Sequence, residues 1–145
     1  MLLAQLGVVM MLLLLSYQDI KQKKVSVAGL ITAFLFAGII VFIRAVNGEL
    51  LIQNAILGIL PGVILFLFSV LDGRVIGKAD GIVLIILGMS LNGDELLIAW
   101  FFIAGGLFII SAICFITLKA RDSLIAFVPI VFVGTVAGLC EGILL

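Results

Sequence analysis

The sequence predicts an all-α integral membrane protein, a single transmembrane domain over residues 1–145 with six membrane-spanning helices. Hydrophobic residues make up 66% of the chain and charged residues 11%, whereas a soluble domain has about 45–50% and about 25%. The mean hydropathy is +1.54. Apolar residues form long runs instead of alternating with polar ones, which is typical of bilayer-spanning helices.

Six apolar runs are separated by short polar connectors. The runs cover residues 1–17, 25–46, 50–71, 81–91, 96–118 and 124–145. The first run lacks the basic region and the small-residue cleavage site of a signal peptide, so we expect it to be a permanent helix.

The basic residues indicate the orientation of the helices in the membrane. Lysine and arginine resist translocation and therefore favour cytoplasmic connectors. All of the 8 basic residues except Arg44 lie in the first, third or fifth connector. These seven are Lys21, Lys23, Lys24, Arg74, Lys78, Lys119 and Arg121. We therefore expect these connectors to be cytoplasmic and both termini to be outside.

The first and fourth runs are too short to cross the bilayer unaided. A spanning helix needs about 20 residues to cross roughly 30 Å of hydrocarbon. The first run reaches this length only by including Asp19, and the fourth only by starting near Gly77 and including Asp80. An acid at that depth is costly, and it marks a candidate functional site.

Small residues recur at four-residue spacing in three places, and we expect them to serve helix packing. These sets are Gly58 and Gly62, Gly77 and Gly81, and Gly134, Gly138 and Gly142. Pro61 is expected to kink or start the third helix, and Pro129 to interrupt the sixth near its cytoplasmic end.

The residue types limit the chemistry that the chain can perform. There is no histidine, and Cys114 and Cys140 lie in apolar runs, so we expect inert cysteines, no metal centre and no cofactor. The basic residues form no block, which excludes nucleic acid as a partner. A Ser–Lys mechanism through Ser26 or Ser123 is a weaker alternative.

Asp19 and Asp80 have both a structural and a functional interpretation. Structurally, Asp80 would be a helix N-cap and Asp19 a helix-end acid beside lysines. Functionally, two aspartates at a low-dielectric boundary would share one proton, because both cannot ionise comfortably. Such a pair activates water for peptide hydrolysis.

The surroundings of both acids resemble the prepilin peptidase family of GxGD-type membrane aspartyl proteases, in the short form without an amino-terminal cysteine-rich region. Asp19 lies in SYQDIKQKKVS (residues 16–26), and Asp80 in GKADGIVLIILG (residues 77–88). The segment IAFVPI (residues 125–130) is similar to the closing F-x-P segment of the family.

The resemblance implies that Asp19 and Asp80 are catalytic, that Gly77, Ala79 and Gly81 shape the loop presenting Asp80, and that the Pro129 region is a substrate or helix-break segment. The expected substrates are type IV pilin-like precursors with a short basic leader, cleaved at the cytoplasmic face of the cell membrane. Two departures from the family pattern stand near Asp80. Ala79 replaces a glycine and so loses access to positive φ, and Ile82 replaces a lysine.

The Ile-Pro that follows the first aspartate in the family is absent here, since Lys24, Val25 and Ser26 stand in its place. Two alternatives therefore stay open. One is a related intramembrane protease with another substrate, and the other is a non-enzymatic scaffold or assembly subunit of the same fold. The sequence leaves the oligomeric state and methylation of the product undecided.

Overall fold

The computed structural model describes residues 2–22, 25–48, 52–71, 77–117 and 127–144 and is all-α over these ranges. Its six helices are α1 (Leu2–Gln22), α2 (Val27–Val46), α3 (Ile52–Leu71), α4 (Lys78–Ser90), α5 (Gly93–Thr117) and α6 (Val128–Leu144). The all-helical class predicted from the sequence is confirmed.

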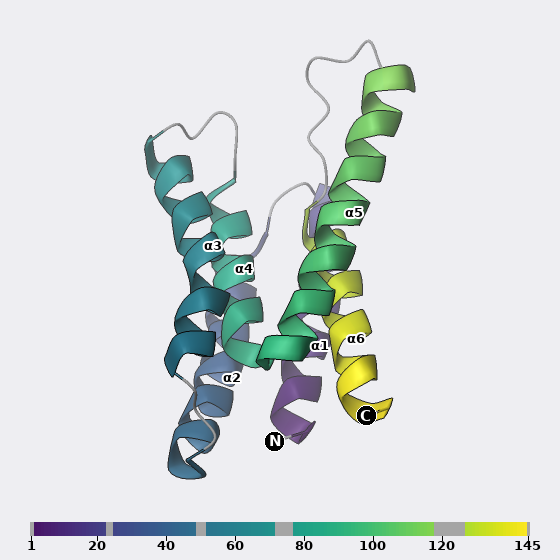
Figure 1. Ribbon diagram of the computed structural model, residues 1–145. Coiled ribbons are helices and arrows are strands. Elements are labelled where there is room, and N and C mark those ends of the chain that lie inside the picture. The colour runs from purple at the N-terminus through teal and green to yellow at the C-terminus, as the bar shows by residue number, and fades with distance from the viewer. Residues whose placement is uncertain (1, 23–24, 49–51, 72–76, 118–126, 145) are drawn as a thin grey trace.

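The helices run up and down side by side, and both ends of the chain lie at the lower end of the view in Figure 1. The helices α1, α2, α4 and α6 form a closed ring, because α1 packs on α2 and α6 while α4 packs on the same two helices. Helix α3 covers α4 from outside, and α5 covers α6. This arrangement makes α4, although short, a central helix.

Glycines allow α3 and α4 to approach closely. Gly58 faces Gly88, and a Cβ atom added to Gly88 would overlap the carbonyl oxygen of Gly58. Further along, a Cβ on Gly81 would lie 2.7 Å from the backbone nitrogen of Phe66. Small residues permit this contact between helices in lipid, where hydrophobic attraction between them is lost. The packing role predicted for Gly58, Gly62 and Gly81 is confirmed, whereas a Cβ on Gly77 would meet only the side chain of Asp80.

The same holds between α5 and α6. A Cβ on Gly134 would lie 2.7 Å from the Cγ1 atom of Ile103, and one on Gly138 would overlap the carbonyl oxygen of Glu95. These two glycines therefore set the distance between the helices. The surroundings of Gly142 lie outside the described side chains.

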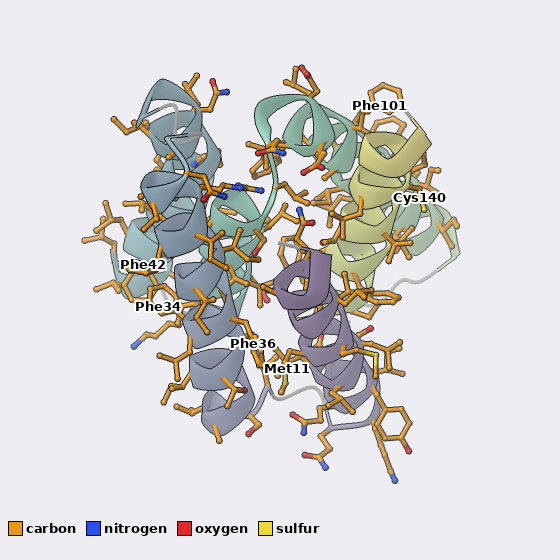
Figure 2. The ribbon with its side chains drawn as sticks, turned by 90° about the horizontal axis from the view of Figure 1, so that it is seen from below. Met11, Phe34, Phe36, Phe42, Phe101 and Cys140 are labelled. Carbon is orange, nitrogen blue, oxygen red and sulfur yellow. The ribbon has the colours of Figure 1, made fainter. Side chains whose placement is uncertain are left out.

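Large apolar side chains cover the outside of the bundle. Phe42 is 68% exposed and Phe101 79% exposed, and Figure 2 shows both pointing outward, while Met11 and Phe36 lie between α1 and α2. Three helical segments are long and apolar enough to cross a membrane, namely Val27–Val46, Asn54–Leu71 and Gly93–Ile113. An apolar exterior of this kind suits a lipid environment.

Of the two roles expected for Pro61, starting α3 is excluded, because Pro61 lies inside this helix. Two other sequence expectations need correction. Pro129 does not interrupt the sixth helix, because α6 begins at Val128 and Pro129 is in its first turn, where backbone N–H groups lack partners within the helix. Cys140 is exposed on the outside of α6 and packs into no core, whereas the side chain of Cys114 lies outside the described residues.

Candidate active site

Asp19 lies on the buried face of α1, one turn after Leu15 and Ser16, and is only 9% exposed. Its Oδ2 atom accepts a hydrogen bond of 3.1 Å from the backbone N–H of Val128, which is 109 residues away in the sequence. Val128 opens α6, and the first N–H groups of a helix have no acceptor within it. Asp19 therefore caps α6 from another helix, a role different from the helix-end acid expected.

Asp80 is the third residue of α4, and the N-cap residue is Gly77, in an extended conformation (φ −71°, ψ 136°). The expectation that Asp80 is itself the N-cap is therefore wrong. Its carboxylate instead reaches back to accept a hydrogen bond from the backbone of Gly77. This is one half of a capping box. A Cβ on Gly77 would lie 3.1 Å from Oδ2 of Asp80, so glycine leaves room for the carboxylate.

The two acids interact electrostatically across the ring of helices. Asp19 comes from the end of α1 and Asp80 from the start of α4, and the packing of both helices on α2 and α6 holds these ends together. The fold thus brings the two acids singled out from the sequence to one place.

Ala79 and Gly81 do not shape a loop, because both lie within α4. Ala79 has helical backbone geometry, so the positive φ lost with the glycine of the family motif is not needed here. Within the described ranges, positive φ occurs in glycine at Gly48. Alanine is about 1 kcal/mol better than glycine in a helix. Gly81 serves the contact with α3 instead.

Tyr17 and Lys21 flank Asp19 on the outer side of α1. The Lys21 Nζ atom lies 5.7 Å from the centroid of the Tyr17 ring, and the tyrosine is 62% exposed. Tyrosine and lysine gather where a helix leaves the hydrocarbon, since each has an apolar body and a polar tip. The end of α1 that carries Asp19 has the composition of a membrane boundary.

Ser26, the candidate for a Ser–Lys mechanism, is engaged in a helix cap. Its hydroxyl accepts a hydrogen bond of 3.5 Å from the N–H of Gly29 at the start of α2. The N–H of Ser26 donates to Oε1 of Gln18 at 3.3 Å. Other residues named in the sequence analysis lie outside the described residues: Lys23, Lys24, Arg74, Lys119, Arg121 and Ser123.

Sequence reasoning missed the role of Arg44 at the other end of α4. Arg44 is 6% exposed, and its guanidinium donates to the carbonyl oxygens of Ser90 at 2.9 Å and Leu91 at 3.1 Å. The last carbonyls of a helix lack partners within it and attract a cation. Arg44 therefore fastens the end of α4 to α2. A lone arginine within an apolar run was the available signal.

Within the described part of the chain, no group of three or more histidine, cysteine, aspartate or glutamate residues is placed to hold a metal ion. Neither a protein family, nor a curated protein, nor a solved structure matches the chain. The function is therefore inferred from the residues and geometry of the site.

Proposed function

We propose that this protein is a membrane aspartyl endopeptidase that removes the short basic leader of type IV pilin-like precursors. The observation that carries the proposal is that Asp19 and Asp80, which come from different helices, lie within electrostatic range of each other. A pair of aspartates is the working unit of aspartic peptidases, in which one proton is shared between two carboxyl groups.

In the proposed reaction, the ionised member of the pair takes a proton from a water molecule as the water attacks the peptide carbonyl. The protonated member donates a hydrogen bond to the carbonyl oxygen, and a proton then passes to the leaving amine. Backbone N–H groups of Val128 and Gly77 hold the two carboxylates. Fixed carboxylates favour catalysis, because general acids and bases act only from within hydrogen-bonding reach.

We infer that all six helices span a cell membrane in a multi-pass bundle, with both termini outside and the acids facing the cytoplasm. The excess of basic residues in the first, third and fifth connectors supports this orientation. Helix α4 has 13 residues, a length of about 20 Å. Since the hydrocarbon is roughly 30 Å thick, a spanning α4 would draw Asp80 to the membrane boundary.

A pilin-like precursor suits a site at this depth. Its apolar helix would lie in the bilayer while its leader remains in the cytoplasm, so the bond between them reaches the boundary. Lys21 and Lys78 lie near the two acids in sequence and would repel a basic leader if they faced it. We propose that they contact lipid phosphates instead.

A second candidate function is a non-enzymatic scaffold or assembly subunit. The observation that favours it is that both acids cap helices, Asp19 at α6 and Asp80 at α4. Capping alone is a sufficient reason for an acid at a helix start. A protease of the same mechanism with another substrate shares the first proposal's evidence and differs only in what it cuts.

The deciding experiment compares wild-type protein with Asp19→Asn and Asp80→Asn in lipid vesicles, using a pilin-like precursor as substrate. Asparagine also caps helices well but cannot act as an acid–base pair. We expect the wild type to cut between leader and helix, and both folded variants to be inactive. Cleavage that persists in either variant overturns the mechanism. A wild type that cuts another membrane peptide but no precursor overturns only the substrate.

A further inference from the structure

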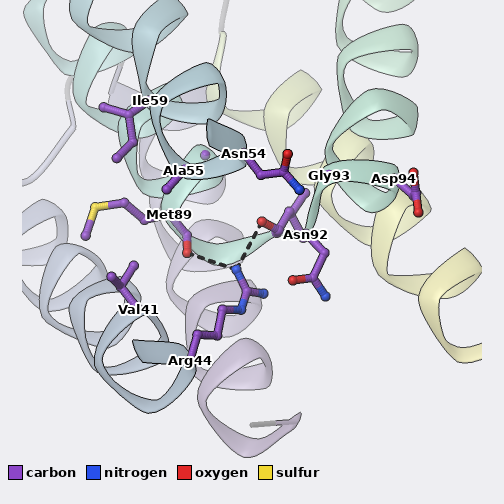
Figure 3. Close-up of a pocket in the computed structure, with 11 residues that line it drawn as sticks. Val41, Arg44, Asn54, Ala55, Ile59, Met89, Asn92, Gly93 and Asp94 are labelled. Carbon is purple, nitrogen blue, oxygen red and sulfur yellow. Dashed lines mark hydrogen bonds between the residues drawn. The ribbon is translucent and has the colours of Figure 1, made fainter. Parts of the chain in front are cut away.

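A pocket of about 270 Å³ lies at the end of α4 opposite the two aspartates. Helices α2 and α3 form its walls, and the last turn of α4 with the start of α5 forms its floor. In Figure 3, Asn54 and Asn92 lie on one side of the Arg44 guanidinium, and Val41, Ile59 and the Met89 side chain lie on the other. The Met89 carbonyl oxygen accepts a hydrogen bond of 3.5 Å from Arg44. The lining is therefore divided into a polar half and an apolar half.

The polar half presents hydrogen-bond donors from different helices. The Arg44 guanidinium is held in place by the carbonyls of Ser90 and Leu91. Asn54 at the start of α3 and Asn92 just before α5 add two carboxamides. The carboxylate of Asp94 points away from the guanidinium in Figure 3. Donors of this kind suit a phosphate group.

The apolar half continues down the helices toward the middle of the bundle. Val41 and Ile59 lie one to two turns inside the helix ends, and Ala55 lies between Asn54 and Ile59 on α3. The walls α2 and α3 are two of the helices long and apolar enough to cross a membrane. A pocket at their ends would lie at the depth of lipid headgroups, with the apolar half toward the acyl chains.

We propose that this pocket binds the phosphodiester headgroup of a membrane phospholipid, with the first part of an acyl chain along Val41 and Ile59. The volume of about 270 Å³ lies just below the 300–1,000 Å³ usual for pockets of drug-sized ligands. It holds a headgroup but not a whole lipid. The lipid would occupy the space between α2 and α3 at this end of the bundle and would not contact the aspartates at the other end of α4.

The test is native mass spectrometry of the purified full chain in detergent with phosphatidylglycerol, phosphatidylcholine, diacylglycerol or inorganic phosphate. Ala55→Phe fills the pocket, and Asn54→Leu removes one carboxamide at an exposed position. The matched control is Ala104→Phe, which adds the same ring at an exposed position of α5. A thermal unfolding scan of each variant identifies any that fails to fold.

We expect the wild type and Ala104→Phe to retain one phospholipid of either headgroup and to retain neither diacylglycerol nor inorganic phosphate. Ala55→Phe should lower retention about tenfold because its ring occupies the pocket, and Asn54→Leu about fivefold, as is typical of losing one polar contact. Equal retention of diacylglycerol overturns phosphodiester recognition. Unchanged retention in both folded pocket variants, or retention of inorganic phosphate alone, overturns the lipid site.

Discussion

The two ends of α4 hold charged groups in different ways. At its last turn, the Arg44 guanidinium is buried and donates to the carbonyls of Ser90 and Leu91. At its first turn, Asp80 is half-buried and accepts from Gly77, while Asp19 accepts from Val128. The cation fastens two helices, whereas each of the two anions accepts from the backbone at the start of a helix.

Under the proposed function, this difference would separate a structural charge at Arg44 from reactive charges at the two aspartates. An ionised carboxylate has about four acceptor sites, and each aspartate uses one for a backbone N–H within the described residues. The remaining acceptor sites suit water, and a protonated carboxyl group can donate a hydrogen bond to a peptide carbonyl oxygen. We therefore expect changes at the aspartate end to alter activity more than stability, and changes at the Arg44 end to do the opposite.

The largest effect is expected from removing either acid. Asp19→Asn and Asp80→Asn should each slow precursor cleavage about 10²–10⁴-fold, the usual contribution of a general acid or base. Because asparagine can cap a helix, the midpoint of thermal unfolding should change little. Cleavage rates and unfolding scans on the same preparations measure both. A large fall in stability with unchanged activity per folded molecule would reverse the assignment.

The next largest effect is a loss of stability on enlarging Gly88 of α4, which packs against Gly58 of α3. Gly88→Leu should destabilise the bundle by about 1–3 kcal/mol, because the new side chain collides with the backbone of Gly58 and overpacking costs this much. The matched control is Gly105→Leu on α5, where an added Cβ meets nothing within 4 Å. Chemical unfolding in mild detergent compares the two. Equal destabilisation by both would contradict the contact.

Replacing Arg44 tests whether the charge at the last turn of α4 serves stability. Arg44→Met should lower the free energy of unfolding by about 1.5–3 kcal/mol, since the buried carbonyls of Ser90 and Leu91 lose a charged donor. Arg44→Lys should recover part of the loss, because lysine keeps the charge but not the planar fork. Unfolding scans give the stability. A variant that is fully stable but inactive would place Arg44 in the reaction instead.

The pH dependence of cleavage should be bell-shaped. Lowering the pH protonates both carboxyl groups and removes the base, and raising the pH ionises both and removes the acid. The rate should therefore fall on both sides of an optimum, with limits that belong to the pair. Initial rates across a pH series with constant ionic strength provide the measurement. A rate that keeps rising into alkaline solution would favour a lysine or serine mechanism.

The smallest effect is expected at Ala79, next to Asp80. Ala79→Gly restores the glycine of the family motif but should reduce stability by about 1 kcal/mol or less, because this position is helical. Cleavage should stay near the wild-type rate, which enzyme assays at matched folded concentration can check. A strong gain in activity would mean that the segment needs a conformation other than the helix.

Helix positions could be predicted from the sequence because they depend on local apolar patterns, whereas the pairing of Asp19 and Asp80 was expected from their shared side of the membrane and the family resemblance. The apolar run at residues 25–46 became α2 (Val27–Val46). Helix α4 begins before the fourth run, at Lys78, as expected, but it has 13 residues, whereas a full span needs about 20. The bond from Val128 to Asp19 joins residues 109 positions apart. No periodicity encodes such a contact, so capping of α6 by α1 was not foreseen.

The Arg44 contact and the geometry of Ala79 escaped prediction for related reasons. Charge counting only assigns Arg44 to the outer side of the membrane, whereas the side chain is buried and reaches the carbonyls at the end of α4. The motif suggested a loop at Ala79, whereas α4 begins at Lys78, immediately after Gly77. In both cases the packing of α4 against α2 and α6 determines a side-chain contact or a backbone conformation that the local sequence does not specify.

The most direct measurement is a double-mutant cycle on precursor cleavage with Asp19→Asn, Asp80→Asn and the doubly substituted protein. If the two carboxyl groups work as one pair, each single change removes the whole effect, and the double variant is no slower than the slower single one. We expect that result in folded protein. Rate losses that multiply, or single variants as fast as the wild type, would contradict a catalytic pair of Asp19 and Asp80.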